Sequence, residues 1–128
     1  MLRPDLQPLE AAVLDRLLAG DHPVLVRLRG QLSRATVTRR ERTGVGFFVD
    51  FALPPAEEPA SVGTLRIGDV AATVTGLQHG AGFVLFVNDG LIKMFEGFSY
   101  DEPWPDEITK FSVRYQDPAR AAIAVQLG

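Results

Sequence analysis

The spacing of apolar residues changes once along this 128-residue chain, and that change constrains the fold more than any motif does. Leucines and valines recur every three or four positions up to residue 32, as in amphipathic helices. From residue 36 onward apolar and polar residues alternate, as in strands with one face on a core. Because the helices come first, residues 1–128 are predicted to form one α+β domain, with two N-terminal helices packed on a mainly antiparallel sheet of five to six strands.

Turn-forming residues divide the helical third into two helices. The apolar stripes comprise Leu9, Val13, Leu14, Leu17 and Leu18 in the first helix, and Val24, Leu25, Leu28 and Leu32 in the second. Pro8 suits the first turn of a helix, where its missing N–H is no loss, and Gly20 suits a helix end. Asp21 is therefore expected to cap the second helix.

Six segments are predicted to form strands. They are 36–42, 45–53, 64–77, 82–87, 91–98 and 110–115. The Asn-Asp-Gly turn at 88–90 predicts a hairpin between the fourth and fifth segments. The fourth segment is apolar on both faces, which favours the centre of the sheet, whereas the charged first segment favours an edge. Gly68 either bends the third segment or divides it in two.

Two further segments lack regular periodicity. Three prolines and two glutamates in 54–63 predict a mobile surface loop. The tail, 117–128, fits a short helix and an edge strand equally well.

Composition and charge exclude several classes of protein and site. The chain has no Cys, so disulfides, thiolate metal sites and Cys nucleophiles are excluded. No signal-peptide pattern opens it and no apolar stretch reaches roughly 20 residues, so we expect a soluble cytoplasmic protein that does not bind membranes. The net charge is −3, and the six arginines between residues 27 and 42 have no aromatic residue among them, which argues against nucleic-acid binding. We expect these arginines and the carboxylates of 96–107 to neutralise each other in part.

No known catalytic motif is present, and no cofactor is predicted. The paired glycines at 44–46 and 80–82 precede strands instead of opening helices, so they do not fit a phosphate-binding loop. Of the two histidines, His22 fits a solvated helix start and His79 lies in a loop. The alternative function is that of a small-ligand-binding or metal-dependent enzyme. Its candidate residues are Asp50, His79, Glu96 and Tyr100.

Glu96 is the carboxylate with the most unusual setting. Strand alternation predicts that it shares a face with the apolar residues Ile92, Met94 and Phe98. A carboxylate on an apolar face is unfavourable unless it is paired or hydrogen-bonded. We therefore expect Glu96 to lie near the strand end in water or to meet a partner such as Arg114.

The segment FEGFSYDEPWPDEI, residues 95–108, holds the only Trp of the chain between two prolines and among five carboxylates. The carboxylates lack the spacing of a calcium-binding loop. Clustered aromatic and acidic side chains suit a docking site for a basic protein partner. The predicted partner-binding residues are Tyr100, Asp101, Glu102, Trp104 and Asp106. Trp104 either anchors a partner or covers one end of the core.

Residues 85–115 resemble the C-terminal segment of an uncharacterised family of small bacterial proteins. The shared pattern is a hairpin whose second strand ends in L/F-E-G-[FY]-[ST]-Y and is followed by an acidic W-P segment. Some members are similar to the immunity-type proteins of bacterial toxin systems, and the resemblance implies no catalytic residue. We therefore favour a non-enzymatic, immunity-like protein-interaction domain over an enzyme, with a homodimer as an alternative form of the interaction.

Overall fold

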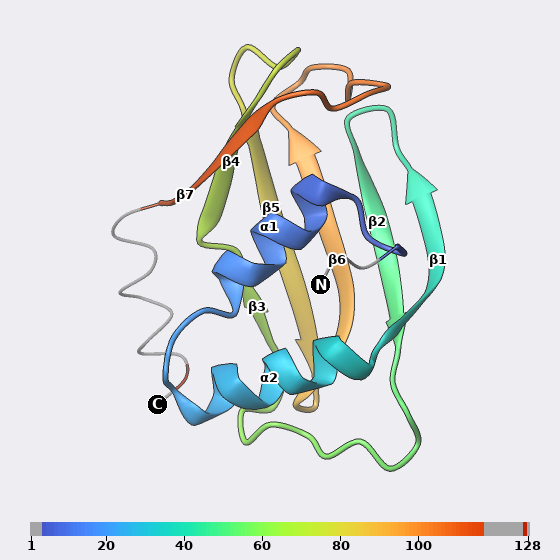
Figure 1. The fold of residues 1–128 in the computed structure, drawn as a ribbon, viewed down its shortest axis with the longest axis vertical. Coiled ribbons are helices and arrows are strands. Elements are labelled where there is room, and N and C mark those ends of the chain that lie inside the picture. Colours follow the sequence, from blue (N-terminus) through green and yellow to red (C-terminus); the bar gives the residue numbers. More distant parts are fainter. Residues whose placement is uncertain (1–3, 117–126, 128) are drawn as a thin grey trace.

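A computed structural model of the chain describes residues 4–116 and residue 127 (Figure 1). Within these residues two helices, α1 (Pro8–Leu17) and α2 (Pro23–Arg34), precede seven strands. The strands are β1 (Thr36–Arg42), β2 (Gly46–Ala52), β3 (Leu65–Ile67), β4 (Val70–Val74), β5 (Ala81–Asn88), β6 (Leu91–Ser99) and β7 (Phe111–Tyr115). The predicted α+β fold is confirmed, and the sheet has one strand more than expected because Gly68 separates β3 from β4. The prediction for the tail concerns 117–126 and 128, which lie outside the described residues.

All pairings between the described strands are antiparallel. The sheet order is β1-β2-β6-β5-β4-β7, and β3 joins β5 beside β4. As predicted, β5 is central and β1 lies at an edge. The predicted β5–β6 hairpin is confirmed as well. Its turn residues Asp89 and Gly90 have φ values of 51° and 78°, the left-handed conformations that a two-residue hairpin turn requires.

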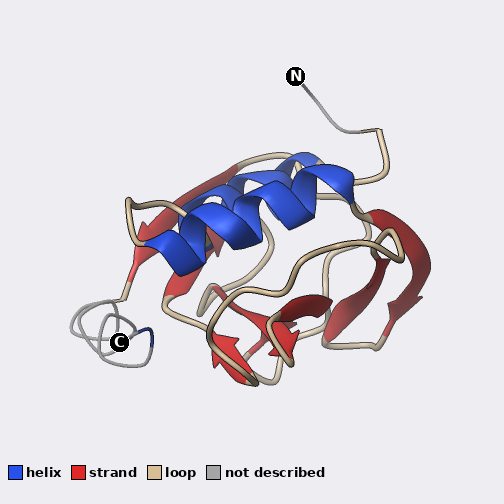
Figure 2. Cartoon of the chain, turned by 90° about the horizontal axis from the view of Figure 1, so that it is seen from below, coloured by secondary structure: helices blue, strands red, loops and turns tan. Residues whose placement is uncertain are grey.

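Both helices cover the same face of the sheet (Figure 2). The side chains between the two layers are mostly apolar, and many of them are at most 1% exposed. They include Val13, Leu14, Leu17 and Leu28 from the helices and Val49, Phe83, Leu85 and Phe95 from the sheet. Because side chains alternate along a strand, the residues between these buried positions point to the opposite face. We call that opposite face the outer face.

The start of α2 differs from the prediction by one residue. His22, not Asp21, is the N-cap, and its Nδ1 accepts a hydrogen bond from the Val24 N–H at 3.1 Å. Pro23 explains the shift because proline is favoured at the first helical position, which makes the residue before it the cap. The start of α1 has a capping box between Gln7 and Glu10.

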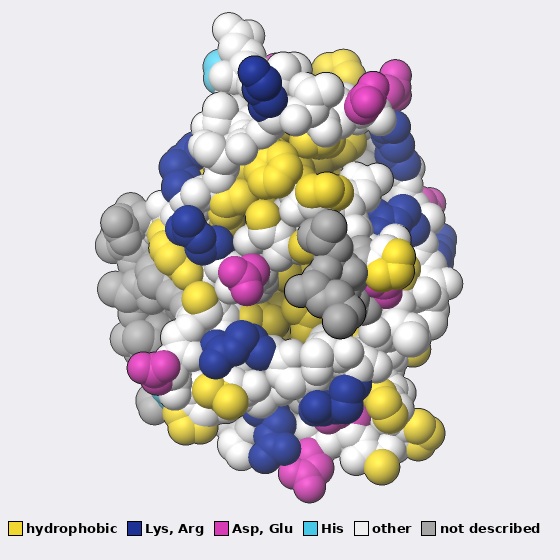
Figure 3. All heavy atoms as spheres, in the orientation of Figure 1, with side chains coloured by type: hydrophobic (Ala, Val, Ile, Leu, Met, Phe, Trp, Pro, Cys, Tyr) yellow, Lys and Arg dark blue, Asp and Glu magenta, His cyan; other side chains and the backbone are white. Residues whose placement is uncertain are grey.

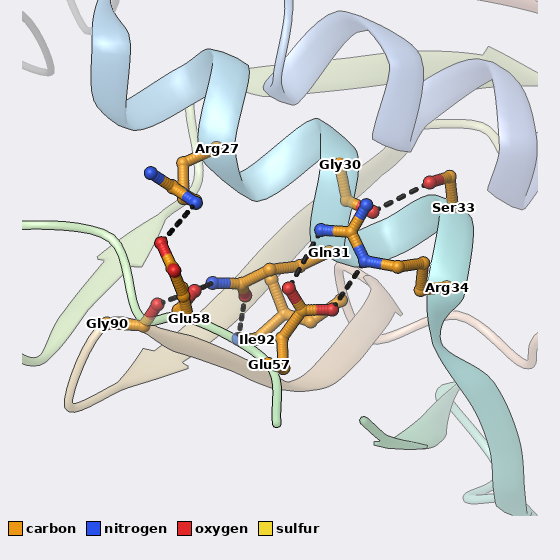
Figure 4. A network of polar contacts seen from close by, with 9 residues as sticks. All are labelled: Arg27, Gly30, Gln31, Ser33, Arg34, Glu57, Glu58, Gly90 and Ile92. Carbon is orange, nitrogen blue, oxygen red and sulfur yellow. Dashed lines mark hydrogen bonds and ion pairs between the residues drawn. The ribbon is translucent and has the colours of Figure 1, made fainter. Parts of the chain in front are cut away.

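The segment 54–63 forms no helix or strand, but α2 fastens it to the sheet (Figure 4). The buried Gln31 side chain donates to the Glu58 carbonyl at 3.1 Å and to the Gly90 carbonyl at 2.9 Å, and accepts from the Ile92 N–H at 2.9 Å. Arg34 forms two hydrogen bonds of 2.8 Å with the Glu57 carboxylate. The pKa of Glu57 is lowered, chiefly by the hydrogen bond from this guanidinium. These contacts argue against the predicted mobility of the loop.

Candidate functional site

The outer face of the sheet is apolar at its centre. Its half-buried apolar side chains are Phe48 of β2, Val84 and Phe86 of β5, and Met94 and Phe98 of β6. In the strand register, Glu96 of β6 lies between Phe48 of β2 and Val84 of β5. Two residues away along β6, Met94 lies between Asp50 of β2 and Phe86 of β5. Both helices lie on the opposite side of the sheet, so no described helix covers these side chains (Figure 2).

Aromatic rings extend the outer face toward the end of β6. Phe98 pairs with Gly82 across the strands, and a Cβ at Gly82 would lie only 2.6 Å from the Phe98 ring. The Phe98 ring therefore lies over the glycine. Tyr100, which is 45% exposed, packs edge-on against Phe98 with ring centroids 5.8 Å apart. Gly82 is therefore required for this packing, because a larger residue at this position would displace the Phe98 ring.

Two carboxylates stand among these apolar side chains. Asp50 lies opposite Met94, and Glu96 lies two residues further along β6, so the two residues are diagonal neighbours with backbones about 7–8 Å apart. Both residues are half-buried. Within the part of the chain that the structure describes, neither side chain has an ion-pair or hydrogen-bond partner.

Two of the three residues that were predicted to share a face with Glu96 do so. Met94 and Phe98 share the outer face with it, but Ile92 is buried on the inner face. The register shifts between the pairs Phe86–Met94 and Val87–Ile92, so Lys93 is an extra residue that reverses the alternation. The suggested partner Arg114 lies on β7, where it donates to Thr73 Oγ1 at 3.0 Å.

A hollow of about 240 Å³ opens on the outer face beside Asp50. It is lined by Arg39, Glu41, Phe48, Asp50 and Met94. Arg39 lies across the strands from Asp50, but its guanidinium pairs with Glu41 at 2.6 Å. The hollow is therefore lined by the apolar Phe48 and Met94, by the Arg39–Glu41 ion pair, and by the Asp50 carboxylate, which has no ion-pair partner among the described residues.

Trp104 faces the core. It is 8% exposed and packs edge-on against Phe47, with ring centroids 5.4 Å apart. Its backbone N–H donates to the Gly44 carbonyl at 2.8 Å, and its carbonyl accepts from Arg42 Nη2 at 2.7 Å. Of the two predicted roles, Trp104 therefore has that of covering one end of the core, and its ring is not available as an anchor for a partner.

The other four predicted partner-binding residues have different settings. Glu102 accepts hydrogen bonds from the backbone N–H groups of Gln78, at 2.7 Å, and His79, at 2.9 Å. These two bonds lower the pKa of Glu102. Asp101 is exposed with φ 64°, and the exposed Asp106 pairs with an arginine of β1 at 3.1 Å. Only Tyr100 adjoins the outer face.

The alternative enzyme site is not gathered into one place. Asp50 and Glu96 are neighbours, but His79 is exposed in the turn between β4 and β5. Ala81, two residues beyond His79, pairs with Ser99, which lies about 10 Å along β6 from Glu96. Among the described residues no three Asp, Glu or His side chains are arranged to hold a metal ion.

The arginines between residues 27 and 42 are engaged within the described chain. Their partners are Glu58 for Arg27, the Leu18 and Gly20 carbonyls for Arg29, Glu57 for Arg34, Glu41 for Arg39, Glu10 for Arg40, and Asp106 for Arg42. Only Asp106 belongs to the acidic segment that was expected to neutralise them. Figure 3 shows basic and acidic side chains interspersed over the helix-bearing side, without a single basic patch.

A second hollow, of about 290 Å³, lies where the start of α1 meets β1 and the segment 104–108. Its walls include Arg40 and Arg42. Arg40 holds the buried Glu10 carboxylate through two hydrogen bonds of 2.5 and 2.9 Å, which raise the pKa of the guanidinium. Arg42 holds the Trp104 carbonyl. Both guanidinium groups therefore bind groups of the chain itself, and the exposed Glu107 adds a carboxylate to the walls of this hollow.

Sequence reasoning missed the outer-face residues Phe48, Val84, Phe86 and Met94 as candidates for binding. The available signal was the apolar character of both faces of 82–87 in an antiparallel sheet, which normally has one solvated face. The described helices are too short and too polar to cross a membrane. Comparison of the chain with models of protein families, with curated proteins and with solved structures found no match.

Proposed function

We propose that this protein is a non-enzymatic protein-interaction domain of the bacterial cytoplasm, of the immunity-like class, and that it holds a protein partner on its outer face. The observation that carries this proposal is the cluster of Phe48, Val84, Phe86, Met94 and Phe98 on a face that no helix of the described residues covers. Adjoining apolar side chains that remain partly exposed, with polar groups at their rim, are typical of interaction surfaces.

The composition of the face supports a protein partner over a small ligand. Aromatic and methionine side chains are enriched in protein interfaces, and this face has three phenylalanines, a methionine and the adjoining Tyr100. The net charge of −3 and the outer-face carboxylates of Asp50 and Glu96, which have no partner among the described residues, favour a basic partner. Residues 85–115 resemble an uncharacterised bacterial family, some members of which are similar to immunity-type proteins, and this resemblance points to the same class.

The test is capture of a partner by the tagged protein from a lysate of its source cells, compared between two variants. Met94→Lys places a cation at the centre of the outer face, opposite the Asp50 carboxylate, with which it is expected to pair. Val26→Lys is the matched control, because Val26 is 49% exposed on α2, on the opposite side of the sheet. Unfolding midpoints of both variants confirm that they are folded.

We expect the wild type and Val26→Lys to capture the same protein and Met94→Lys to capture at least about tenfold less of it. Equal capture by all three forms would contradict the proposal that the outer face is the binding surface. If a second copy of the chain is the only protein captured, the interaction is a homodimer and not a complex with another protein.

A further inference from the structure

The hollow beside Asp50 indicates what kind of side chain the partner presents. Asp50 lies across the sheet from Met94 and diagonal to Glu96, at the centre of the outer face. We infer that an arginine side chain of the partner enters this hollow, with its stem against Phe48 and Met94 and its guanidinium on the Asp50 carboxylate. This inference rests on the proposed function, because it names the chemistry of the partner at the same face.

The charges around the hollow require a cation from outside. Asp50 and Glu41 are two carboxylates, and Arg39 is the one guanidinium among the lining residues. That guanidinium is paired with Glu41 at 2.6 Å, although its backbone lies opposite Asp50. A partner that covers the face removes water from the Asp50 carboxylate, which is unfavourable unless the partner also supplies a positive charge.

The walls of the hollow fit arginine better than lysine. The guanidinium is planar and stacks on aromatic rings, and its fork of donors matches a carboxylate with two parallel hydrogen bonds. Phe48 provides the ring and Asp50 the carboxylate, while the thioether of Met94 contacts the apolar stem. Glu96 provides a second carboxylate next to the hollow.

A second copy of the chain fits this surface less well than a basic partner does. Two outer faces packed together would bring the Asp50 and Glu96 carboxylates of both copies into one area shielded from water. Like charges in such an area repel one another and disfavour the complex. The occupant that the charges favour is therefore a protein with an exposed arginine flanked by apolar residues.

The test uses N-acetyl-arginine amide as a probe of the hollow, titrated at low ionic strength into isotope-labelled protein and followed by NMR. Asp50→Asn replaces the carboxylate by an amide of the same shape, at a side chain without a partner in the described chain, so the variant keeps its fold. Asp15→Asn is the matched control, because it removes an exposed carboxylate on α1. N-acetyl-lysine amide is titrated in parallel.

We expect saturable shifts at Phe48, Asp50 and Met94 in the wild type and in Asp15→Asn. The probe should bind Asp50→Asn at least about fivefold more weakly, and the lysine probe should bind the wild type more weakly than the arginine probe. Absence of saturable shifts, equal binding to Asp50→Asn, or tighter binding of the lysine probe would each overturn the inference. None of these results changes the outcome expected in the Met94→Lys capture experiment, so the proposed function is tested independently of this inference.

Discussion

Replacement of Gln31 by methionine tests how one buried amide joins α2 to the sheet. The Gln31 side chain is 0% exposed, and methionine has a similar length, so the substitution leaves little change in volume. It removes the hydrogen bonds to the Glu58 and Gly90 carbonyls and the one from the Ile92 N–H. The effect on stability therefore reports the hydrogen bonds rather than the packing.

The expected loss of stability depends on which hydrogen bonds each backbone group keeps in the Gln31→Met variant. The Gly90 carbonyl keeps a hydrogen bond of 2.8 Å from the Ala60 N–H, so its loss is partial. The bonds from Gln31 to Gly90 and Ile92 are both buried, and an unsatisfied buried group costs about 1–3 kcal/mol. We expect the free energy of unfolding to fall by about 3 kcal/mol, a large part of the roughly 5–15 kcal/mol of a typical domain.

Denaturant unfolding measures the loss, and amide hydrogen exchange at Ile92 locates it. Ser33→Ala is the control, because Ser33 is exposed on the same helix, and it should change the stability by less than about 0.5 kcal/mol. A loss below about 1 kcal/mol for Gln31→Met, or unchanged exchange at Ile92, would refute the reasoning.

Four further substitutions test other parts of the fold. Gly97→Ala places a Cβ 2.4 Å from a phenylalanine ring and should lower the free energy of unfolding by about 1–3 kcal/mol in the same denaturation assay. Gly30 lies inside α2 near only a flexible side chain, so Gly30→Ala should raise the free energy of unfolding by about 0.5–1 kcal/mol. Arg40→Met leaves the buried Glu10 carboxylate without its guanidinium and should cost about 3 kcal/mol; a cost under about 1 kcal/mol would contradict that role. Because the folded-state pKa of Glu102 is lowered, its contribution is fully present above its unfolded pKa of about 4.3 and is lost as the pH falls through the folded-state value. The thermal midpoints of the wild type and Glu102→Ala should therefore differ at pH of about 7 and converge at pH of about 2–3, and a constant difference would contradict this assignment.

The sequence was sufficient for the order and type of the elements, because periodicity and turn chemistry are local. The change of spacing near residue 35 predicted helices before strands, and the Asn-Asp-Gly turn predicted the β5–β6 hairpin. The sequence pattern allowed either one bent strand or two short strands around Gly68 and did not decide between them. It assigned the cap of α2 to Asp21 because aspartate is a frequent cap, whereas the position of Pro23 decided for His22.

The candidate site was predicted less well, because it depends on contacts between distant residues. The extra residue Lys93 moves Ile92 to the inner face, and nothing in the strand pattern marks that bulge. Gln31 fastens a loop that its prolines suggested was mobile, through partners 27, 59 and 61 residues away. The sequence also could not tell which face of the sheet the helices cover, so 82–87 indicated a central strand but not an outer apolar face.

Site-specific photo-crosslinking tests the central claim, that the outer face holds a protein partner, most directly. Benzoylphenylalanine replaces Phe86 on the outer face or Val26 on α2 in two otherwise identical proteins, which are irradiated in a lysate of the source cells. We predict a single adduct with another protein from position 86 and none from position 26. No adduct from position 86, or equal adducts from both positions, would contradict the claim.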